Sequence, residues 1–322
     1  MSVDPMTITI NAASKKGPIL LNMTVYNQFD FQGKWFKGNL HSHLGRSNEV
    51  QKIADWYETH EYDFLALTDH DVIRPADNDR SSGLTIIQGA EISECHVVGL
   101  GIDRVAPRAP RSAAGLTAIL ESIKSQGGIA VLAHPHWMGW SWDELRTAAE
   151  AGIGGFEVFN SLCKTINGKG RADQLWELLI QEGYFPAAVG SDDAHSMDSP
   201  CLGGAWTGVL AGENSQRSLF ESIASNRTYA SEGPSIKSIV WDPEGLIRVE
   251  CSPCTACYFS SVRSGARGIY PEPPDRTSER FELNLAVQGY RIERYVRIVI
   301  EDDHGRRAWS SPIRVDVTQN DV

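Results

Sequence analysis

The feature that most constrains the fold is an alternation of short apolar runs with amphipathic helical segments between Lys34 and Pro234. Runs that are short, apolar and partly β-branched or aromatic are typical of buried strands. Five such runs are predicted as strands, namely Asp63–Thr68, Leu84–Ala90, Ile129–Ala133, Phe156–Asn160 and Pro186–Ser191. Strands that alternate with helices favour a mainly parallel sheet in an α/β fold, either open or closed into a barrel.

Three helices are predicted between these strands. Two of them show apolar residues at the spacing of one helix face, which are Leu116, Ile119, Leu120 and Ile123 in the first and Leu175, Leu178 and Leu179 in the last. Gly127 and Gly183 follow these faces and are expected to end the two helices. The remaining helix is expected to begin at a capping box formed by Ser141 and Glu144.

The pattern changes after Pro234. Residues 235–322 alternate apolar and polar side chains, with turn signals between the runs, which predicts an antiparallel, sandwich-like β domain. Residues 1–33 also contain strand-like runs and are expected to pack on that β domain. The chain is therefore divided into an N-terminal strand segment (1–33), an α/β domain (34–234) and a C-terminal β domain (235–322).

Composition excludes several classes of protein. The net charge is −11 and no lysine or arginine block stands out, so we expect no nucleic-acid partner. No apolar run reaches the length of a membrane span, and residues 1–10 do not resemble a secretory signal. Six cysteines form no disulfide framework in a chain of this size, so reduced thiols and a cytoplasmic location are expected. Cys251, Cys254 and Cys257 have a zinc-like spacing, but no fourth ligand is evident nearby.

Residue types that bind metals follow four of the predicted strands and one further strand-like stretch that ends at Leu40. They are His41, His43, Asp69, His70, Glu91, His134, Asp193 and His195. The carboxyl ends of the strands in such a fold converge on one face, so these side chains are expected to meet. Imidazoles and carboxylates suit divalent zinc, manganese or iron. His41 and His43 point to the same side of an extended segment, and the two oxygens of Glu91 suit a bridge between two ions.

Other polar residues have a simpler interpretation. His60 and His304 are expected to be solvated. His136 could line the pocket, but packing against Trp137 is the favoured interpretation. Arg46 follows the two histidines, where it could bind a substrate oxyanion or simply face solvent. Asn160 could line the pocket or tie down a loop.

Six motifs in this order resemble the PHP family, named for polymerase and histidinol phosphatase: "NLHSH", "LTDHD", "GAEIS", "HVVGLGID", "AHPH" and "GSDDAH". The resemblance implies a distorted (β/α)7 barrel, two or three divalent metal ions and hydrolysis of phosphate esters. The stretches "WFKGNLHSH", "EVFNS" and "YASEGP", with the C-terminal ending, resemble the branch that includes carbaryl hydrolase. That branch carries a C-terminal β domain and includes an enzyme that hydrolyses a carbamate ester.

The resemblance also implies a ligand set. The first ion would be held by His41, His43, Glu91 and Asp193, and the second by Glu91, His96 and His134. His70 and His195 would belong to a third site. The family's first motif usually continues to Ser-Asp-Gly, whose aspartate helps to bind the third ion. This chain has Ser47, Asn48 and Glu49 there, so the third site is expected to be weak or absent, or to be completed by Glu49.

These expectations converge on a metal-dependent hydrolase of a small molecule, with manganese, zinc or iron as the ion. A metal-bound water, ionised near neutral pH, would attack the phosphorus of a phosphate ester. Asp193, His195 and Arg46 are the candidate catalytic residues. The alternatives are hydrolysis of a carbamate, ester or amide at the same site and, less favoured, a metal-binding protein without catalysis. The sequence leaves the oligomeric state open.

Overall fold

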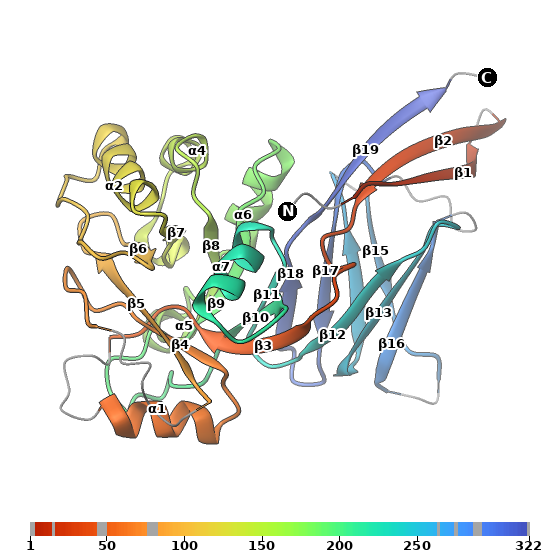
Figure 1. The fold of residues 1–322 in the computed structure, drawn as a ribbon. Coiled ribbons are helices and arrows are strands. Elements are labelled where there is room, and N and C mark those ends of the chain that lie inside the picture. The colour runs from red at the N-terminus through yellow and green to blue at the C-terminus, as the bar shows by residue number, and fades with distance from the viewer. Residues whose placement is uncertain are drawn as a thin grey trace. The chain divides into compact units, whose positions relative to one another are not determined.

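The computed structural model describes residues 4–14, 17–43, 50–75, 83–262, 265–273, 276–285 and 292–320. The chain forms two compact units (Figure 1). One unit comprises residues 33–232, and the other combines residues 1–32 with residues 233–322. The 33–232 unit contains every residue that the sequence predicts as a metal ligand, so it is described first.

The 33–232 unit alternates strands and helices. Its strands are β3 (Lys34–Asn39), β4 (Phe64–Leu67), β5 (Thr85–Ile92), β6 (Val97–Leu100), β7 (Ile129–Leu132), β8 (Gly155–Asn160), β9 (Ala187–Ser191), β10 (Trp206–Ala211) and β11 (Thr228–Ser231). Its helices are α1 (Val50–Thr59), α2 (Ala113–Ser125), α3 (Pro135–Met138), α4 (Trp142–Glu150), α5 (Ser161–Asn167), α6 (Asp173–Gln181) and α7 (Gln216–Ala224). Each of the five predicted strands therefore overlaps an observed one.

The sheet of this unit is mixed, with the strand order β11-β10-β3-β4-β5-β6-β7-β8-β9. β3, β4 and β5 are parallel to one another, as are β7, β8 and β9. β6 is antiparallel to β5 and β7, and β10 is antiparallel to β3 and β11. The prediction of a mainly parallel sheet is thus wrong in part. β5 and β6 are joined by a turn at 93–96, which is too short for the crossover that a parallel pair needs.

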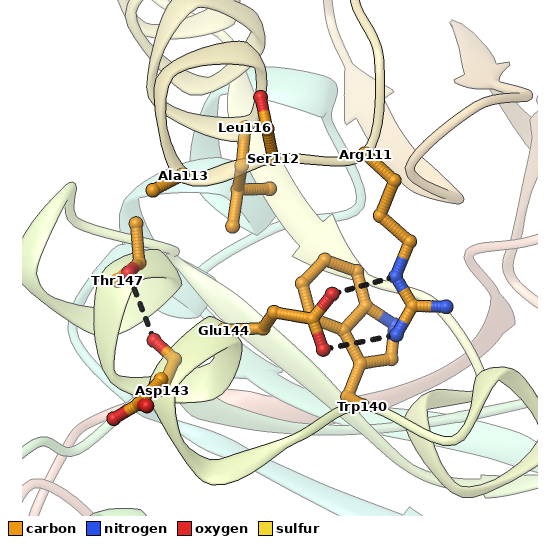
Figure 2. Close-up of a pocket in the computed structure, with 8 residues that line it drawn as sticks. All are labelled: Arg111, Ser112, Ala113, Leu116, Trp140, Asp143, Glu144 and Thr147. Atoms are coloured by element: carbon orange, nitrogen blue, oxygen red, sulfur yellow. Dashed lines mark hydrogen bonds and ion pairs between the residues drawn. The ribbon is translucent and has the colours of Figure 1, made fainter.

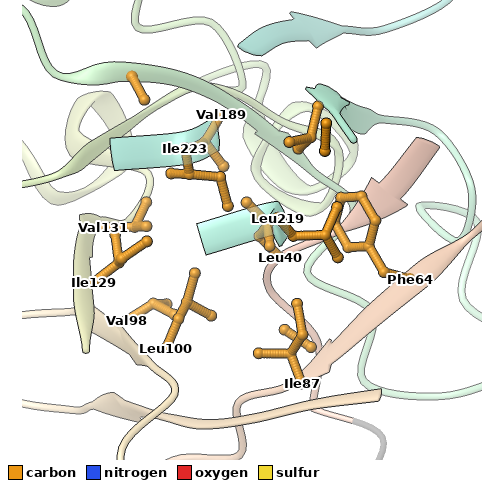
Figure 3. Close-up of a cluster of buried hydrophobic side chains, with 14 of the residues drawn as sticks. Leu40, Phe64, Ile87, Val98, Leu100, Ile129, Val131, Val189, Leu219 and Ile223 are labelled. Atoms are coloured by element: carbon orange, nitrogen blue, oxygen red, sulfur yellow. The ribbon is translucent and has the colours of Figure 1, made fainter. Parts of the chain in front are cut away.

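Most strands of the sheet contribute to one apolar core (Figure 3). The core contains side chains from β4, β5, β6, β7, β9 and β10, together with Leu219 and Ile223 of α7. Val209 of β10 and Val189 of β9 both belong to it, although these strands lie far apart in the strand order. The sheet therefore curves strongly around a core that includes one face of α7. Each fully buried aliphatic side chain of this kind stabilises the fold by about 1.5–3 kcal/mol.

β9 approaches β10 and β11 through side-chain hydrogen bonds. Thr207 Oγ1 donates to Gly190 O at 2.9 Å, and Thr228 Oγ1 donates to Ala188 O at 2.9 Å. A Cβ atom at position 190 would lie 2.6 Å from Trp206 O, so this approach requires glycine. Strand pairing does not continue from β9 to β11, so the sheet is not closed by its backbone ladder.

The prediction for the α2 face is confirmed, because Leu116, Ile119, Leu120 and Ile123 are all buried. The face predicted for α6 is wrong in part. That helix buries Trp176, Leu179 and Ile180, whereas Leu178 is 46% exposed. The apolar spacing alone could not decide between adjacent stripes of an apolar-rich helix.

Arg111 stabilises the segment between α3 and α4 (Figure 2). Its guanidinium donates two hydrogen bonds to the carboxylate of Glu144, at 2.8 and 3.0 Å. It also donates to Met138 O at 2.9 Å and lies over the ring of Trp140, 4.9 Å from the centroid. Glu144 closes the predicted capping box with Ser141 at the start of α4. One ion pair thus holds both the end of α3 and the beginning of α4.

We expect Glu144→Gln to lower the free energy of unfolding by about 1 kcal/mol at pH 7, because it removes the charge from the pair with Arg111. Partial burial alone would raise the pKa of Glu144, but hydrogen bonds from Arg111 and Ser141 lower it overall. A carboxyl group with a lowered pKa in the folded state stabilises the fold above its unfolded pKa. That stability is lost as the pH falls through the folded pKa. In urea unfolding, the difference between wild type and variant should shrink below about pH 4.

Glu150→Gln is the matched control for this prediction. Glu150 ends the same helix and is 53% exposed, and its carboxylate lies 3.7 Å from Arg146. Such an exposed pair contributes about 0.5 kcal/mol or less. An equal loss of stability in the two variants would show that the bond to Arg111 contributes nothing specific.

The other unit is built from strands, which are β1 (Met6–Ser14), β2 (Gly17–Tyr26), β12 (Ile236–Trp241), β13 (Leu246–Cys254), β14 (Ala256–Ser260), β15 (Ala266–Ile269), β16 (Ser278–Asn284), β17 (Arg294–Glu301), β18 (Arg307–Ser310) and β19 (Ile313–Asn320). β12, β13 and β16 form one antiparallel sheet. In the other sheet, β1 pairs with β2, β2 with β19, and β19 with β17, all antiparallel. The strands of residues 4–26 thus pair with a strand from the C-terminal part of the same unit.

The three closely spaced cysteines lie on two strands of this unit. Cys251 and Cys254 belong to β13 and Cys257 to β14, and all three are buried. Burial raises the pKa of the Cys257 thiol well above its ordinary value. Among the described residues, the groups that could hold a metal ion do not include these three cysteines. Among the described helices, none is both long and apolar enough to cross a membrane.

Candidate metal centre

The structure brings the eight metal ligands that the family resemblance implies together at one rim of the curved sheet. They are His41 and His43 after β3, His70 after β4, Glu91 on β5, His96 in the turn before β6, His134 after β7, and Asp193 and His195 after β9. Glu91 differs from the expectation that it follows its strand, because β5 continues through it to Ile92. Its side chain is fully buried.

Backbone hydrogen bonds fix the segments that carry these residues. Asp193 N donates to His41 O at 3.1 Å, and His43 N donates to Ala194 O at 2.9 Å. These two bonds accompany a parallel bridge between Ser42 and Ala194. The segments that follow β3 and β9 are therefore held side by side, although they are about 150 residues apart in the chain.

Four ligand atoms form the closest group. They are Nε2 of His41, Nε2 of His43, Oε2 of Glu91 and Oδ1 of Asp193, with five separations between 3.1 and 3.5 Å. Ligands about 2.0–2.1 Å from one tetrahedral ion would lie roughly 3.3–3.4 Å apart. The five separations therefore match those expected of atoms that share one divalent cation. The convergence of His41 and His43 also agrees with their predicted position on the same side of an extended segment.

The second oxygen of Glu91 faces two other imidazoles. Oε1 lies 2.7 Å from Nδ1 of His96 and 3.2 Å from Nε2 of His134. The carboxylate thus faces two sets of imidazoles with its two oxygens, as a bridging ligand would. His70 lies beside the first set, because its Nδ1 is 3.1 Å from Glu91 Oε2.

A third group consists of imidazoles alone. Ligand atoms of His43, His70 and His195 lie within 4.8 Å of one another. The ring of His43 stacks on the rings of His70 and His195, with centroids 4.3 and 4.2 Å away. His43 therefore belongs both to this group and to the group that contains Asp193.

Two buried oxygens of the cluster make no hydrogen bond of good geometry within the described residues. They are Glu91 Oε2 and Asp193 Oδ1, and each has at least two imidazole nitrogens within 3.5 Å. An unpaired buried carboxylate oxygen is costly. A divalent cation between these oxygens and the imidazoles would remove that cost, and the mixed nitrogen and oxygen donors suit zinc, manganese or iron. The residues present therefore fit a metal ion.

Three of the predicted ligands adopt a left-handed backbone conformation. The φ angles are 46° at His96, 28° at His134 and 54° at Asp193. This region is sparsely populated by residues other than glycine and costs about 1–3 kcal/mol at each position. Such strain persists where the surroundings fix the backbone, and it is common at functional sites.

Charges in the cluster shift the pKa values in opposite directions. Burial alone would lower the pKa of His41, but Asp193, Glu91 and Glu157 outweigh it and raise that pKa well above its ordinary value. Burial alone would raise the pKa of Asp193, yet the surrounding imidazoles lower it to about 2. The pKa of His195 is lowered by burial and by the neighbouring His43. The carboxylates are therefore charged, and His195 is neutral near pH 7.

Glu157 is a residue of the site that the sequence analysis missed. It is fully buried on β8, and its Oε1 lies 3.0 Å from Nδ1 of His41. Its other oxygen accepts from the backbone N of His134 at 2.6 Å and from Asn160 Nδ2 at 2.9 Å. A carboxylate on Nδ1 keeps the proton there, so Nε2 of His41 faces the cluster as a ligand atom. The sequence contained one indication of this role, because Glu157 is a charged residue inside the apolar run "GFEVFN".

We expect Glu157→Gln to weaken the binding of Zn²⁺ or Mn²⁺ by about tenfold to a hundredfold, because an amide cannot accept all the hydrogen bonds that now orient His41 and His134. Competition with a chromophoric chelator measures the dissociation constant. Glu232→Gln is the control, since Glu232 is a similarly buried carboxylate that pairs with Arg171 and Lys164. The same loss of metal affinity in both variants would contradict an orienting role for Glu157.

Asp192 forms a second buried anchor next to the cluster. Its carboxylate accepts from Tyr57 OH at 2.6 Å, from Asn39 Nδ2 at 2.5 Å and from Gly203 N at 3.0 Å. Burial raises the pKa of Asp192 to about 6. These bonds connect the end of β3, helix α1 and the loop after β9. They therefore restrain the two segments that carry His41 and Asp193.

The remaining predicted residues have different outcomes. Arg46, with Ser47, Asn48 and Glu49, lies outside the described residues. Asn160 contacts the cluster and caps a helix: its Nδ2 lies 3.2 Å from Asp193 Oδ2, and its Oδ1 caps α5 by accepting from Cys163 N at 2.8 Å. His60 and His304 are exposed, as predicted.

The expectation that His136 packs against Trp137 is wrong. Nδ1 of His136 lies 2.8 Å from Arg171 O, and its side chain is exposed. The ring of Trp137 instead contacts His96 and His134, with centroids 5.6 and 5.2 Å away. Successive residues of a helix point in different directions, so neighbours in the sequence do not face each other.

Comparison with known proteins adds little to this geometry. No protein-family model matches the chain, and no curated protein matches it. One similar solved structure is a two-domain protein from Bacteroides vulgatus ATCC 8482, described as containing a predicted PHP-like metal-dependent phosphoesterase. The two chains are 15% identical, with 92% of this chain and 98% of that chain covered and a TM-score of 0.49.

Proposed function

We propose that this chain is a metal-dependent hydrolase of the PHP type that cleaves phosphate esters of small molecules. The observation that carries the proposal is the buried group of His41, His43, Glu91 and Asp193, in which five of the six separations between ligand atoms are 3.1–3.5 Å. The six motifs that resemble this family support it, since each contributes a residue to the cluster or to its surroundings. In this proposal the curved sheet is a distorted (β/α)7 barrel, and residues 34–234 and 235–322 are separate domains.

The proposed ligands are those that the resemblance implies. His41, His43, Glu91 and Asp193 would hold one ion, and Glu91, His96 and His134 would hold a second. His70 and His195 would contribute to a weaker third site. Manganese, zinc and iron are the candidate ions, because the donors are imidazoles and carboxylates.

The bound ions would activate water for attack and stabilise negative charge on the group under attack. The protein's own residues prepare that reaction. Asn160 Nδ2 lies 3.2 Å from Asp193 Oδ2 and holds this carboxylate in place. His195 Nδ1 lies 2.9 Å from Asp193 O, and because a carbonyl only accepts, the proton is on Nδ1. Nε2 of the half-exposed His195 is then free to bind a cation or to move a proton.

A substrate panel tests this proposal. Protein loaded with Mn²⁺, Zn²⁺ or Fe²⁺ is assayed with phosphomonoesters, phosphodiesters and aryl carbamates. We expect the highest kcat/KM with a phosphate ester. Turnover of carbamates, carboxylic esters or amides alone would show that the same cluster serves acyl chemistry, and no turnover in any metal form would contradict an enzymatic role.

A further inference from the structure

Trp137 is an exposed aromatic residue beside the candidate metal centre. It follows His134 by three residues, on the short helix α3, and its side chain is 37% exposed. Its ring meets those of His96 and His134 edge to face, at interplanar angles of 67° and 83°. Both imidazoles contact Oε1 of Glu91, at 2.7 and 3.2 Å. The indole therefore contacts both imidazoles that lie next to Oε1 of Glu91, the proposed bridging carboxylate.

The backbone holds Trp137 in this position. Pro135 occupies the first turn of α3, and Gly139 ends the helix with φ 62°. Arg111 donates to Met138 O at 2.9 Å while its guanidinium is paired with Glu144 (Figure 2). The backbone carbonyl of Met138, next to Trp137, is thus held by Arg111, which is itself held by Glu144. A residue whose position is fixed before binding loses little entropy when a ligand contacts it.

The two tryptophans of "HWMGW" have opposite environments. Trp140 is 5% exposed and is covered by Arg111, so it anchors the segment. Trp137, in contrast, keeps part of its apolar ring exposed to solvent, next to the imidazoles of His96 and His134. A second exposed apolar side chain, Val72 (38%), follows His70 by two residues. Exposed apolar surface next to polar, convergent groups is characteristic of small-molecule sites.

We propose that Trp137 selects substrates in which the esterified group is aromatic, by stacking or edge contact with that ring. The inference rests on the proposed function, since it places the phosphate at the cluster and the organic group on Trp137. An aromatic group has the flat apolar surface and the quadrupole that an indole ring binds best. A short alkyl group would cover much less of the indole and gain correspondingly less.

Two phosphonates of the same charge test this proposal without turnover. Phenylphosphonate and methylphosphonate are titrated into the metal-loaded protein by calorimetry. We expect Trp137→Ala to weaken phenylphosphonate about tenfold and methylphosphonate less than about twofold. Trp137→Phe should restore most of the affinity for phenylphosphonate. Trp142→Ala is the control, because Trp142 on α4 is 36% exposed and has no ring contact with the cluster among the described residues.

The outcomes separate this inference from the proposed function. Equal weakening of both phosphonates by Trp137→Ala, or no weakening of either, would overturn the role of Trp137 while leaving the phosphoesterase proposal intact. The same loss from Trp142→Ala would also overturn it. If the wild-type protein bound neither phosphonate and hydrolysed no phosphate ester, both proposals would fall together.

Discussion

Glu91→Ala is expected to abolish tight metal binding and to lower kcat/KM by about a thousandfold or more. Glu91 is fully buried, and its two oxygens face imidazoles of His41, His43, His70, His96 and His134. Without it, neither proposed ion keeps its shared anionic ligand, and Asp193 alone is left among the proposed ligands to compensate the charge of two dications. Metal content measured by mass spectrometry and steady-state kinetics on the same preparation report the two losses.

The fold should survive this substitution. Glu91 takes part in β5 through its backbone, which the change leaves intact, and the apolar core that stabilises the unit does not include it. Circular dichroism and the urea midpoint check this point. His304→Ala serves as the control, because His304 is 70% exposed and its ion-pair contact is with Asp303 in the other unit. Equal loss of metal in the two variants would place the site elsewhere.

The second large effect is expected from removal of metal. Chelation followed by gel filtration should reduce turnover by about a thousandfold or more, since the proposed ions would supply the activation of water. Addition of Mn²⁺, Zn²⁺ or Fe²⁺ should restore turnover, and addition of Mg²⁺ less well, because imidazole suits the first three ions better. Full activity in protein shown to contain no metal would refute the mechanism.

Most of the candidate ligands could be predicted because they are polar residues next to short apolar strands, whereas His96 was implied by the family resemblance alone. His41, His70, His134 and Asp193 are far apart in the chain, but the rule that strand ends converge in such folds predicts their meeting. The sequence could not give the distances between their atoms. Those depend on the curvature of the sheet and on backbone bonds such as the one from Asp193 N to His41 O.

Features that depend on long-range contacts were missed. Glu157 lies within an apolar strand, and only the folded structure shows that its carboxylate faces His41 rather than solvent. The antiparallel direction of β6 and β10 could likewise not be predicted from the sequence, because a short apolar run does not reveal whether its neighbours are parallel. On α6, the indole of Trp176 is bonded to Pro186 O, and this contact selects a face that the leucine spacing does not predict.

Anomalous diffraction from crystals of the metal-loaded protein, recorded at the absorption edge of the bound metal, tests the central claim most directly. The account predicts two strong peaks on either side of Glu91, one among His41, His43 and Asp193 and the other beside His96 and His134. A third peak between His70 and His195 should be weaker, because no carboxylate of the described residues belongs to the group that they form with His43. Peaks that avoid Glu91, or a cluster that remains without metal while the protein turns over substrate, would contradict the account.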